Sequence, residues 1–259
     1  MTSEMTRSAF SRALRTVVTA AVGACALVAT AAPAPAAPSP EAGPGAAASG
    51  FLNLHQCAYY ATSLDDHFST FVTPSGDGRY ATGTERSATA DTAAECGPGN
   101  GNHNPVPVLH GVRALGLGTG RYLNLQQCDY YRAASTDHFT TLVTPSGDGR
   151  YATGTKVSNT PETRPACGPG NGSHVPNPGL SAARALDLTA GRHLNLHQCV
   201  YYSERQASHL TTVVPGADSR YTTGTNVSDT ADTRPVCGPG NGDHVPVPLL
   251  SAVKSIPLG

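Results

Sequence analysis

Charged residues are scarce in this 259-residue sequence and are nowhere gathered into a run of one sign. They make up 14% of the chain, with 17 Lys and Arg against 18 Asp and Glu. Proteins that bind nucleic acid or anionic membranes concentrate Lys and Arg on one face, because these partners carry dense negative charge. We therefore predict that the protein binds neither of them.

Motifs of common catalytic sites are also missing. The chain contains no Gly-x-Ser-x-Gly, no His-Glu-x-x-His and no phosphate-binding loop. A Gly-rich segment, Cys-Gly-Pro-Gly-Asn-Gly, occurs three times but is never followed by the Lys-Ser/Thr pair that a phosphate loop requires. An active site breaks repeat symmetry, whereas here the polar positions recur together. We therefore predict that the protein is not an enzyme.

The first 36 residues have the layout of a secretory signal peptide. A basic stretch with three Arg residues leads into an apolar run at 17–32 and a small-residue site at 34–36. The run is too short to stay as a membrane span. In an alternative prediction Cys25 is the acylated residue of a lipoprotein signal. Residues 37–50, rich in Ala, Pro and Gly, are predicted to be a disordered leader, so the mature protein is expected to be extracellular.

The remaining residues, 51–259, form a threefold repeat. The motif Leu-Asn-Leu-His/Gln-Gln-Cys occurs at 52–57, 123–128 and 194–199, spaced 71 residues apart each time. We expect a single domain in which no repeat buries its apolar face alone. Its three units are expected at about 51–121, 122–192 and 193–259.

The two ends of this repeat are complementary. An apolar segment precedes the motif in the second and third units, and its last copy, 251–259, has no strand after it. The first motif, at 51–57, has no such segment before it. If these two orphan segments pair, the repeats form a ring without exposed strand edges. We therefore predict an all-β, closed, pseudo-threefold structure.

Each unit carries two cysteines at equivalent positions, and an even, repeated set in an exported protein predicts disulfides. Repeat symmetry favours one bridge within each unit or one between neighbouring units, and we favour the first because it requires the same local geometry three times. A zinc site is disfavoured because the chain has no Cys-x-x-Cys. The expected pairs are Cys57 with Cys96, Cys128 with Cys167, and Cys199 with Cys237.

Hydrophobic alternation predicts four strands in each unit, twelve in all. In the second unit, residues 122–131 alternate as a half-buried strand whose Cys128 points away from the core. A hairpin with arms at 137–144 and 150–155 and a turn at 145–149 is expected next. The Gly-rich segment 167–172 is expected to be a tight loop, and 180–188 a fourth strand. No long run has helical periodicity.

Three four-stranded units with termini that meet resemble the architecture of a β-trefoil. The units are long for that fold, so the Gly-rich loops are expected to be excursions from it. The resemblance to ricin-type trefoil lectins ends at architecture, because the chain has no Trp and therefore lacks their Gln-x-Trp motif.

A second resemblance is to Asp-His-Phe-Tyr-Thr-type repeats of secreted bacterial cell-wall-associated proteins. It rests on Tyr130-Tyr131 followed by 137–141, and on Tyr59-Tyr60 followed by 66–70, while the third unit departs from it at 208–210. It covers a minor part of each unit. This resemblance implies an accessory module that binds envelope glycans and has no activity of its own.

Histidines recur at two positions of the repeat. One set is His67, His138 and His209; the other is His103, His174 and His244. Three equivalent histidines near a threefold axis can hold Zn²⁺. A histidine beside an acid in a strand more often makes hydrogen bonds, so we predict no metal and no cofactor, and we expect the second set to orient the Gly-rich loop.

Carbohydrate binding needs an aromatic face together with short polar groups, and each unit offers both. The predicted ligand-binding residues are Tyr60, Asp66, His67, Tyr131, Asp137, His138, Tyr202 and His209. The sequence therefore predicts a secreted, multivalent protein that binds glycans or envelope polymers. Two alternatives stay open. One is a module that binds a secreted protein, such as a protease inhibitor or toxin-complex subunit, and the other is a metal-dependent secreted enzyme.

Overall fold

The computed structural model describes residues 50–74, 79–144 and 150–259. The predicted signal peptide, the leader up to residue 49, Cys25 and the predicted turn at 145–149 lie outside the described residues. The described residues belong to one compact unit. No helix in the described ranges is long and apolar enough to cross a membrane.

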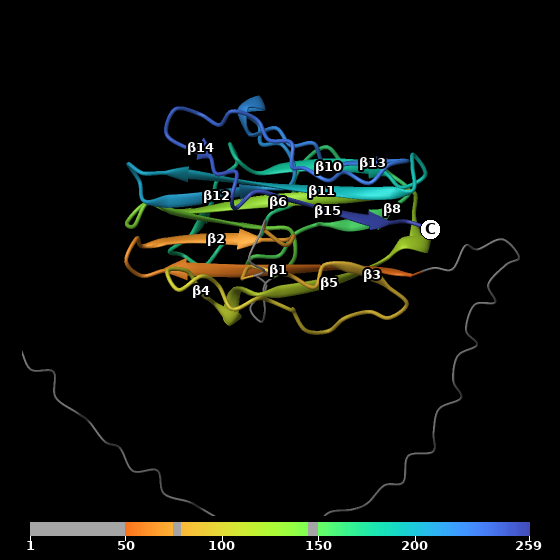
Figure 1. Cartoon of the computed structure of the whole chain (residues 1–259), viewed down its shortest axis with the longest axis horizontal. Helices are drawn as coiled ribbons and strands as arrows, with labels where there is room; N and C mark the ends of the chain where they lie inside the picture. Colours follow the sequence, from red (N-terminus) through yellow and green to blue (C-terminus); the bar gives the residue numbers. More distant parts are fainter. Residues whose placement is uncertain (1–49, 75–78, 145–149) are drawn as a thin grey trace, which may run out of the picture. The chain divides into compact units, whose positions relative to one another are not determined.

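The fold is all-β, as the sequence predicts, with three five-stranded antiparallel sheets (Figure 1). The first sheet contains β1 (Phe51–Ala61), β2 (Asp66–Thr70), β3 (Glu85–Ser87), β4 (Asn104–Pro105) and β5 (Gly111–Gly116). The second contains β6 (Tyr122–Arg132), β7 (Asp137–Thr141), β8 (Lys156–Ser158), β9 (Val175–Pro176) and β10 (Ala182–Asp187). The third contains β11 (His193–Ser203), β12 (Ser208–Thr212), β13 (Asn226–Ser228), β14 (Val245–Pro246) and β15 (Ala252–Pro257). Three 3₁₀ turns, η1 (Pro107–Leu109), η2 (Leu117–Thr119) and η3 (Ser219–Tyr221), complete the described elements.

The expected number of strands was wrong, and so was one arm of the predicted hairpin. Each sheet has five strands rather than four, because two of them are only two or three residues long and show no alternation. Residues 150–155 contain no strand beyond an isolated bridge between Thr153 and Cys167. Their backbone bonds to the Gly-rich loop instead, with Gly168 N donating to Ala152 O and Gly170 N to Arg150 O. The backbone hydrogen bonds of residues 150–155 are therefore made with the Gly-rich loop rather than with β7.

The long first strand of each sheet is its centre. One half of β1 pairs with β3 and β5, and the other half pairs with β2 and β4. The predicted alternation is present, but the expectation of a half-buried strand was wrong because both of its faces are covered. Leu52 and Leu54 enter the main core, whereas Cys57 and Tyr59 pack in a smaller cluster with Phe68. The disulfide-linked loop supplies this second cover.

A single apolar core is shared by all three units. It contains the leucine pairs of the three central strands, together with Phe71, Val72, Leu142, Val143, Val213 and Val214. Burying one leucine stabilises a fold by roughly 1.5–3 kcal/mol, so no unit keeps its full share of this stabilisation without the others.

The predicted pairing of the last segment with the first strand was wrong. β15 pairs with β11 of its own sheet, from Ala252 opposite Gln198 to Pro257 opposite His193. The physical reason is that β1 has no edge to offer, since β3 and β5 already occupy both sides of its first residues. β5 and β10 return in the same way to β1 and β6.

The units are connected to one another by side chains in cyclic order. The side-chain oxygen of Gln56 accepts the backbone N–H of Leu142 at 2.9 Å, and Gln127 accepts that of Val213 at 2.7 Å. Gln198 of the third unit accepts the N–H of Phe71 in the first, at 2.5 Å. The first unit is therefore bonded to both of the others.

Strands β2, β7 and β12 also contact one another pairwise. Where they meet, three hydroxyls form a hydrogen-bonded group: Thr140 Oγ1 lies 2.6 Å from Thr211 Oγ1 and 3.0 Å from Ser69 Oγ. This group, which is fully buried, draws one residue from each unit.

The three disulfides lie within units, as the repeat spacing predicts. They join Cys57 to Cys96, Cys128 to Cys167, and Cys199 to Cys237. Each ties the Gly-rich loop to the central strand, and a tyrosine two residues along that strand adds a hydrogen bond: Tyr59 Oη donates to Gly97 O at 2.9 Å. Gly99 in this loop has φ +83°, and a Cβ there would come within 2.1 Å of His103 O. Glycine is therefore required at this turn.

A histidine or glutamine on the central strand holds the segment before the loop. His55 Nδ1 accepts from Glu95 N at 2.8 Å, so its Nε2 carries the proton and donates to Asp91 at 2.9 Å. In the second unit the Gln126 amide makes both types of contact, since its oxygen accepts from Ala166 N and its nitrogen donates to Glu162. A neutral amide can therefore replace this histidine without changing its hydrogen bonds.

Candidate functional site

The two adjacent tyrosines of each unit have different environments. Tyr59, Tyr130 and Tyr201 are fully buried in the small clusters, and burial raises the pKa of each to about 12. The second tyrosine of each pair is half-buried and lies against a histidine. The ring centroids are 4.4 Å apart for Tyr60 and His67, 4.7 Å for Tyr131 and His138, and 4.6 Å for Tyr202 and His209. Only the second tyrosine of each pair is therefore available at the surface.

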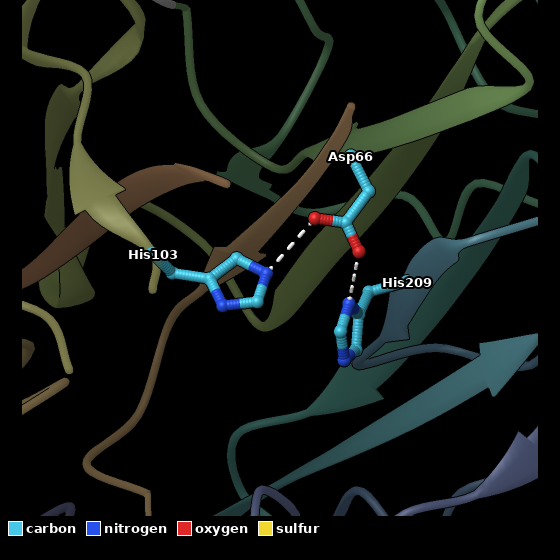
Figure 2. Close-up of side chains that lie close together, drawn as sticks. All are labelled: Asp66, His103 and His209. Atoms are coloured by element: carbon cyan, nitrogen blue, oxygen red, sulfur yellow. Dashed lines mark hydrogen bonds and ion pairs between the residues drawn. The ribbon is translucent and has the colours of Figure 1, made fainter. Parts of the chain in front are cut away.

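Each of these histidines is fixed by an acid, but the acid is not the one beside it in the sequence. Asp66 at the start of β2 is fully buried, and its two carboxylate oxygens accept from different histidines. Oδ1 lies 2.9 Å from His103 Nε2 in the same unit. Oδ2 lies 2.7 Å from His209 Nδ1 on β12 of the third unit (Figure 2). We call these three residues the Asp66 cluster.

The same arrangement joins the first and second units. Asp137 at the start of β7 is fully buried and accepts from His174 Nε2 at 3.0 Å and from His67 Nδ1 at 2.8 Å. His174 belongs to the unit of Asp137, and His67 comes from the preceding unit. We call this set the Asp137 cluster.

The third equivalent position differs, because Ser208 stands where the other units have Asp66 and Asp137. Ser208 Oγ lies 3.1 Å from His244 Nε2. His138 bonds instead to Asp129 of its own sheet, at 3.1 Å. These four residues, Ser208, His244, His138 and Asp129, form the Ser208 cluster, in which no carboxylate lies between the two histidines.

The residues that lie together in the structure therefore differ from the groups that we expected from the sequence. We expected Tyr60, Asp66 and His67 to form one site. Instead, Tyr60 lies on His67 and donates to Asp65, His67 bonds to Asp137, and Asp66 bonds to His209. The roles of His103, His174 and His244 as partners of the strand residues at 66, 137 and 208 were missed, although their repetition at one position of every unit was a visible signal.

Most of the polar residues predicted to bind a ligand are not accessible. Asp66 and Asp137 are 0% exposed, and His138 and His209 are 6% and 7% exposed. His67 is half-buried, with 12% of its side chain exposed. The tyrosines, rather than the acids, are therefore the surface part of the predicted site.

The buried acids are held in the ionised form. Burial by itself raises the pKa of Asp66, but hydrogen bonds from His103 and His209 outweigh it, so the net pKa is lowered. The pKa of Asp137 is lowered in the same way by His174 and His67. In the Ser208 cluster, burial and the neighbouring His138 lower the pKa of His244 to about 4.

Two of these clusters contain donor sets that a transition metal accepts. In each, two histidine nitrogens and a carboxylate oxygen lie within 4.8 Å of one another. However, Nδ1 of His103 and Nδ1 of His174 are buried without a hydrogen-bond partner among the described residues. A metal-bound histidine normally donates its other N–H to a neighbour, and these two do not. The geometry is that of two histidine N–H groups donating to one carboxylate, so the clusters act as ties between segments.

The three equivalent strand histidines, which the sequence disfavours as a metal site, do not share a partner. His67, His138 and His209 each face a different acid, namely Asp137, Asp129 and Asp66. Ser208 and His244 are close enough for a nucleophile and base, but Ser208 is 0% exposed and a substrate does not reach it.

Comparisons with protein-family models, curated proteins and solved structures found no match to this chain.

Proposed function

We propose that this is a secreted, non-catalytic protein that binds glycans of a cell envelope at several equivalent positions. The observation that carries the proposal is the repeated surface tyrosine. Tyr60, Tyr131 and Tyr202 are each half-buried, each lies on a histidine, and each of these histidines is fixed by a buried carboxylate. A fixed aromatic ring suits the C–H face of a sugar and costs little conformational entropy on binding.

The polar residues of the predicted site have a supporting role in this proposal. Asp66, Asp137, His138 and His209 are too buried to meet sugar hydroxyls, so they orient the tyrosines and tie the units together. His67 is more exposed than these four residues, with 12% of its side chain exposed, so it is the one able to meet a ligand directly. Three weak sites on one rigid body give useful avidity on a polymer, because each bound site raises the effective concentration of the others.

We further propose that the domain is a closed, pseudo-threefold structure of β-trefoil type. The support is the cyclic order of contacts, since Gln198 bonds to Phe71, His209 to Asp66, and β15 contacts β3. These contacts run from the third unit to the first. The glutamine and strand contacts recur between both pairs of consecutive units, and the His–Asp contact recurs between the first and second units, where His67 bonds to Asp137. Secretion is supported by the three disulfides, which are typical of oxidising compartments.

A cell-wall pull-down combined with a glycan array tests this function. We would make Tyr60→Ala, Tyr131→Ala and Tyr202→Ala as single, double and triple variants. Retention of the protein on the cell wall is expected to fall with each added substitution, while each variant stays folded. The matched control is Tyr122→Ala, which removes a half-buried tyrosine that the other two units replace with Phe51 and His193. Undiminished retention of the triple variant would place the site elsewhere. No retention of the wild type on any wall fraction or glycan would favour a protein partner instead.

A further inference from the structure

Two surface clefts occupy equivalent places in successive units. One, of about 370 Å³, combines residues of the first unit with Thr144 of the second. The other, of about 750 Å³, combines residues of the second unit with Pro215 of the third. All eight residues that line the first cleft have a counterpart 71 positions later in the lining of the second. The clefts are therefore part of the repeated architecture, and the surface tyrosines line neither of them.

The clefts differ most in charge. Ala93 in the first cleft corresponds to Arg164 in the second. Arg164 is exposed, and its guanidinium has no hydrogen-bond or ion-pair partner among the described residues. The nearest acid in the sequence, Glu162, is engaged by Lys156 at 2.6 Å and by the Gln126 amide. The positive charge of Arg164 is therefore not neutralised by its surroundings.

The wall of the second cleft is rigid. Four prolines line it, namely Pro165, Pro176, Pro178 and Pro215, and the disulfide-bonded Cys167 is part of the same wall. Proline fixes its backbone φ angle, and the disulfide restrains the loop that carries Arg164. A ligand that enters this cleft orders little of the protein, which lowers the entropic cost of binding.

We propose that the cleft beside Arg164 binds the anionic group, carboxylate or phosphate, of a repeating polymer. A guanidinium presents paired N–H donors that match either group, and the proline walls contact the apolar part of the repeat unit. The proposal rests on the proposed function and names the chemical class of its ligand. The third unit carries the same Thr-Arg-Pro sequence at Thr233, Arg234 and Pro235, and Arg234 is also exposed and without an ion-pair partner among the described residues. Arg234 is therefore expected to provide a second anionic subsite.

Binding of the intact protein to three immobilised polymers tests the proposal. Polygalacturonate supplies carboxylates, poly(glycerol phosphate) supplies phosphates, and dextran is the neutral control. Wild type is expected to bind at least one anionic polymer, more weakly at high salt, and the polymer retained identifies the preferred anion. Losing a charged hydrogen bond weakens binding by about tenfold, so Arg164→Gln combined with Arg234→Gln is expected to lower affinity by at least that factor.

Two variants make the test specific. Arg192→Gln removes the same charge from another exposed arginine without an ion-pair partner in the described residues, and it is expected to leave affinity within about twofold. Ala93→Arg places a guanidinium in the first cleft and is expected to raise affinity for the same anionic polymer.

The inference is overturned if the double variant binds as well as Arg192→Gln does. It also fails if wild type binds neutral envelope glycans but neither anionic polymer, which leaves the proposed function intact. If wild type binds no glycan, wall fraction or anionic polymer, both proposals fail.

Discussion

Asp66 of the first unit and His209 of the third form a buried contact of 2.7 Å between residues 143 positions apart in the sequence. The carboxylate also accepts from His103, and no part of it is exposed. Together with the bond from Phe71 N to Gln198, this contact joins the first unit to the last. Stability of the whole domain is therefore expected to depend on a few polar residues at the unit boundaries.

Asp66→Asn tests this dependence. The substitution keeps the shape of the side chain but removes the charge and replaces one acceptor oxygen with a donor. Breaking a buried, hydrogen-bonded pair costs about 3 kcal/mol, so the free energy of unfolding is expected to fall by that order. Urea denaturation followed by circular dichroism measures it. Asp229→Asn, at an exposed position, is the control and is expected to change the free energy of unfolding by less than about 0.5 kcal/mol.

Acid is expected to destabilise the protein in two steps. The pKa of His244 is lowered to about 4 in the folded state, so the unfolded chain binds its proton first. The contribution of His244 to the free energy of unfolding is fully present above pH about 6.5 and is lost as the pH falls toward 4. The pKa values of Asp66 and Asp137 are lowered below their unfolded values, so their contribution is lost only below pH about 4. A series of unfolding curves between pH 3 and 8 that showed no change between 6.5 and 4 would contradict the first step.

Ser208→Asp tests the cause of the low pKa of His244. The introduced carboxylate would restore the arrangement of the Asp66 and Asp137 clusters and is expected to raise the pKa of His244, because an adjacent negative charge favours the imidazolium. Titration of the His244 ring protons by NMR measures the change. Ser208→Ala, which removes the hydroxyl without adding charge, should leave that pKa low. An unchanged pKa of His244 in the aspartate variant would show that the missing carboxylate is not the cause of the low value.

The local and repeated features of the fold were predictable from the sequence. Alternation identified the central strand, since Leu123 and Leu125 do share one face. The repeated cysteine spacing of 39, 39 and 38 residues gave the disulfide pairs, because one local geometry recurs three times. The short strands were missed because two or three residues carry no periodic signal.

Contacts between distant segments were not predictable. The sequence places His67 beside Asp66, but neighbouring residues on a strand point to opposite faces, so His67 meets an acid from another unit. Which unit provides that acid depends on how the sheets are arranged in space. The burial of Cys128 was missed for a similar reason, since the loop that covers it comes from residues near Cys167. The partner of β15 was misjudged because the sequence did not show that both sides of β1 were already paired.

Removing the second disulfide is expected to loosen one unit and weaken the whole domain. Cys128→Ser with Cys167→Ser frees the loop that carries Arg164, and the chain-entropy model assigns about 3–4 kcal/mol to a bridge of this span. Urea denaturation of the double variant, compared with wild type under oxidising conditions, measures the loss. Non-reducing peptide mapping of the wild type is the accompanying check, and a linkage such as Cys96 to Cys128 would contradict pairing within units.

Deleting residues 250–259 is expected to unfold the domain as a whole. The deletion removes β15, with Ala252 and Ile256 from the shared core, and leaves one edge of β11 unpaired. Because the core residues of the three units pack in one cluster, losing this strand also exposes apolar side chains of the first and second units. Calorimetry is expected to show one transition for the wild type, and for the truncated protein either one transition at much lower temperature or none. A truncated protein in which two units melt at the wild-type temperature would show that the units are independent and would refute a closed structure.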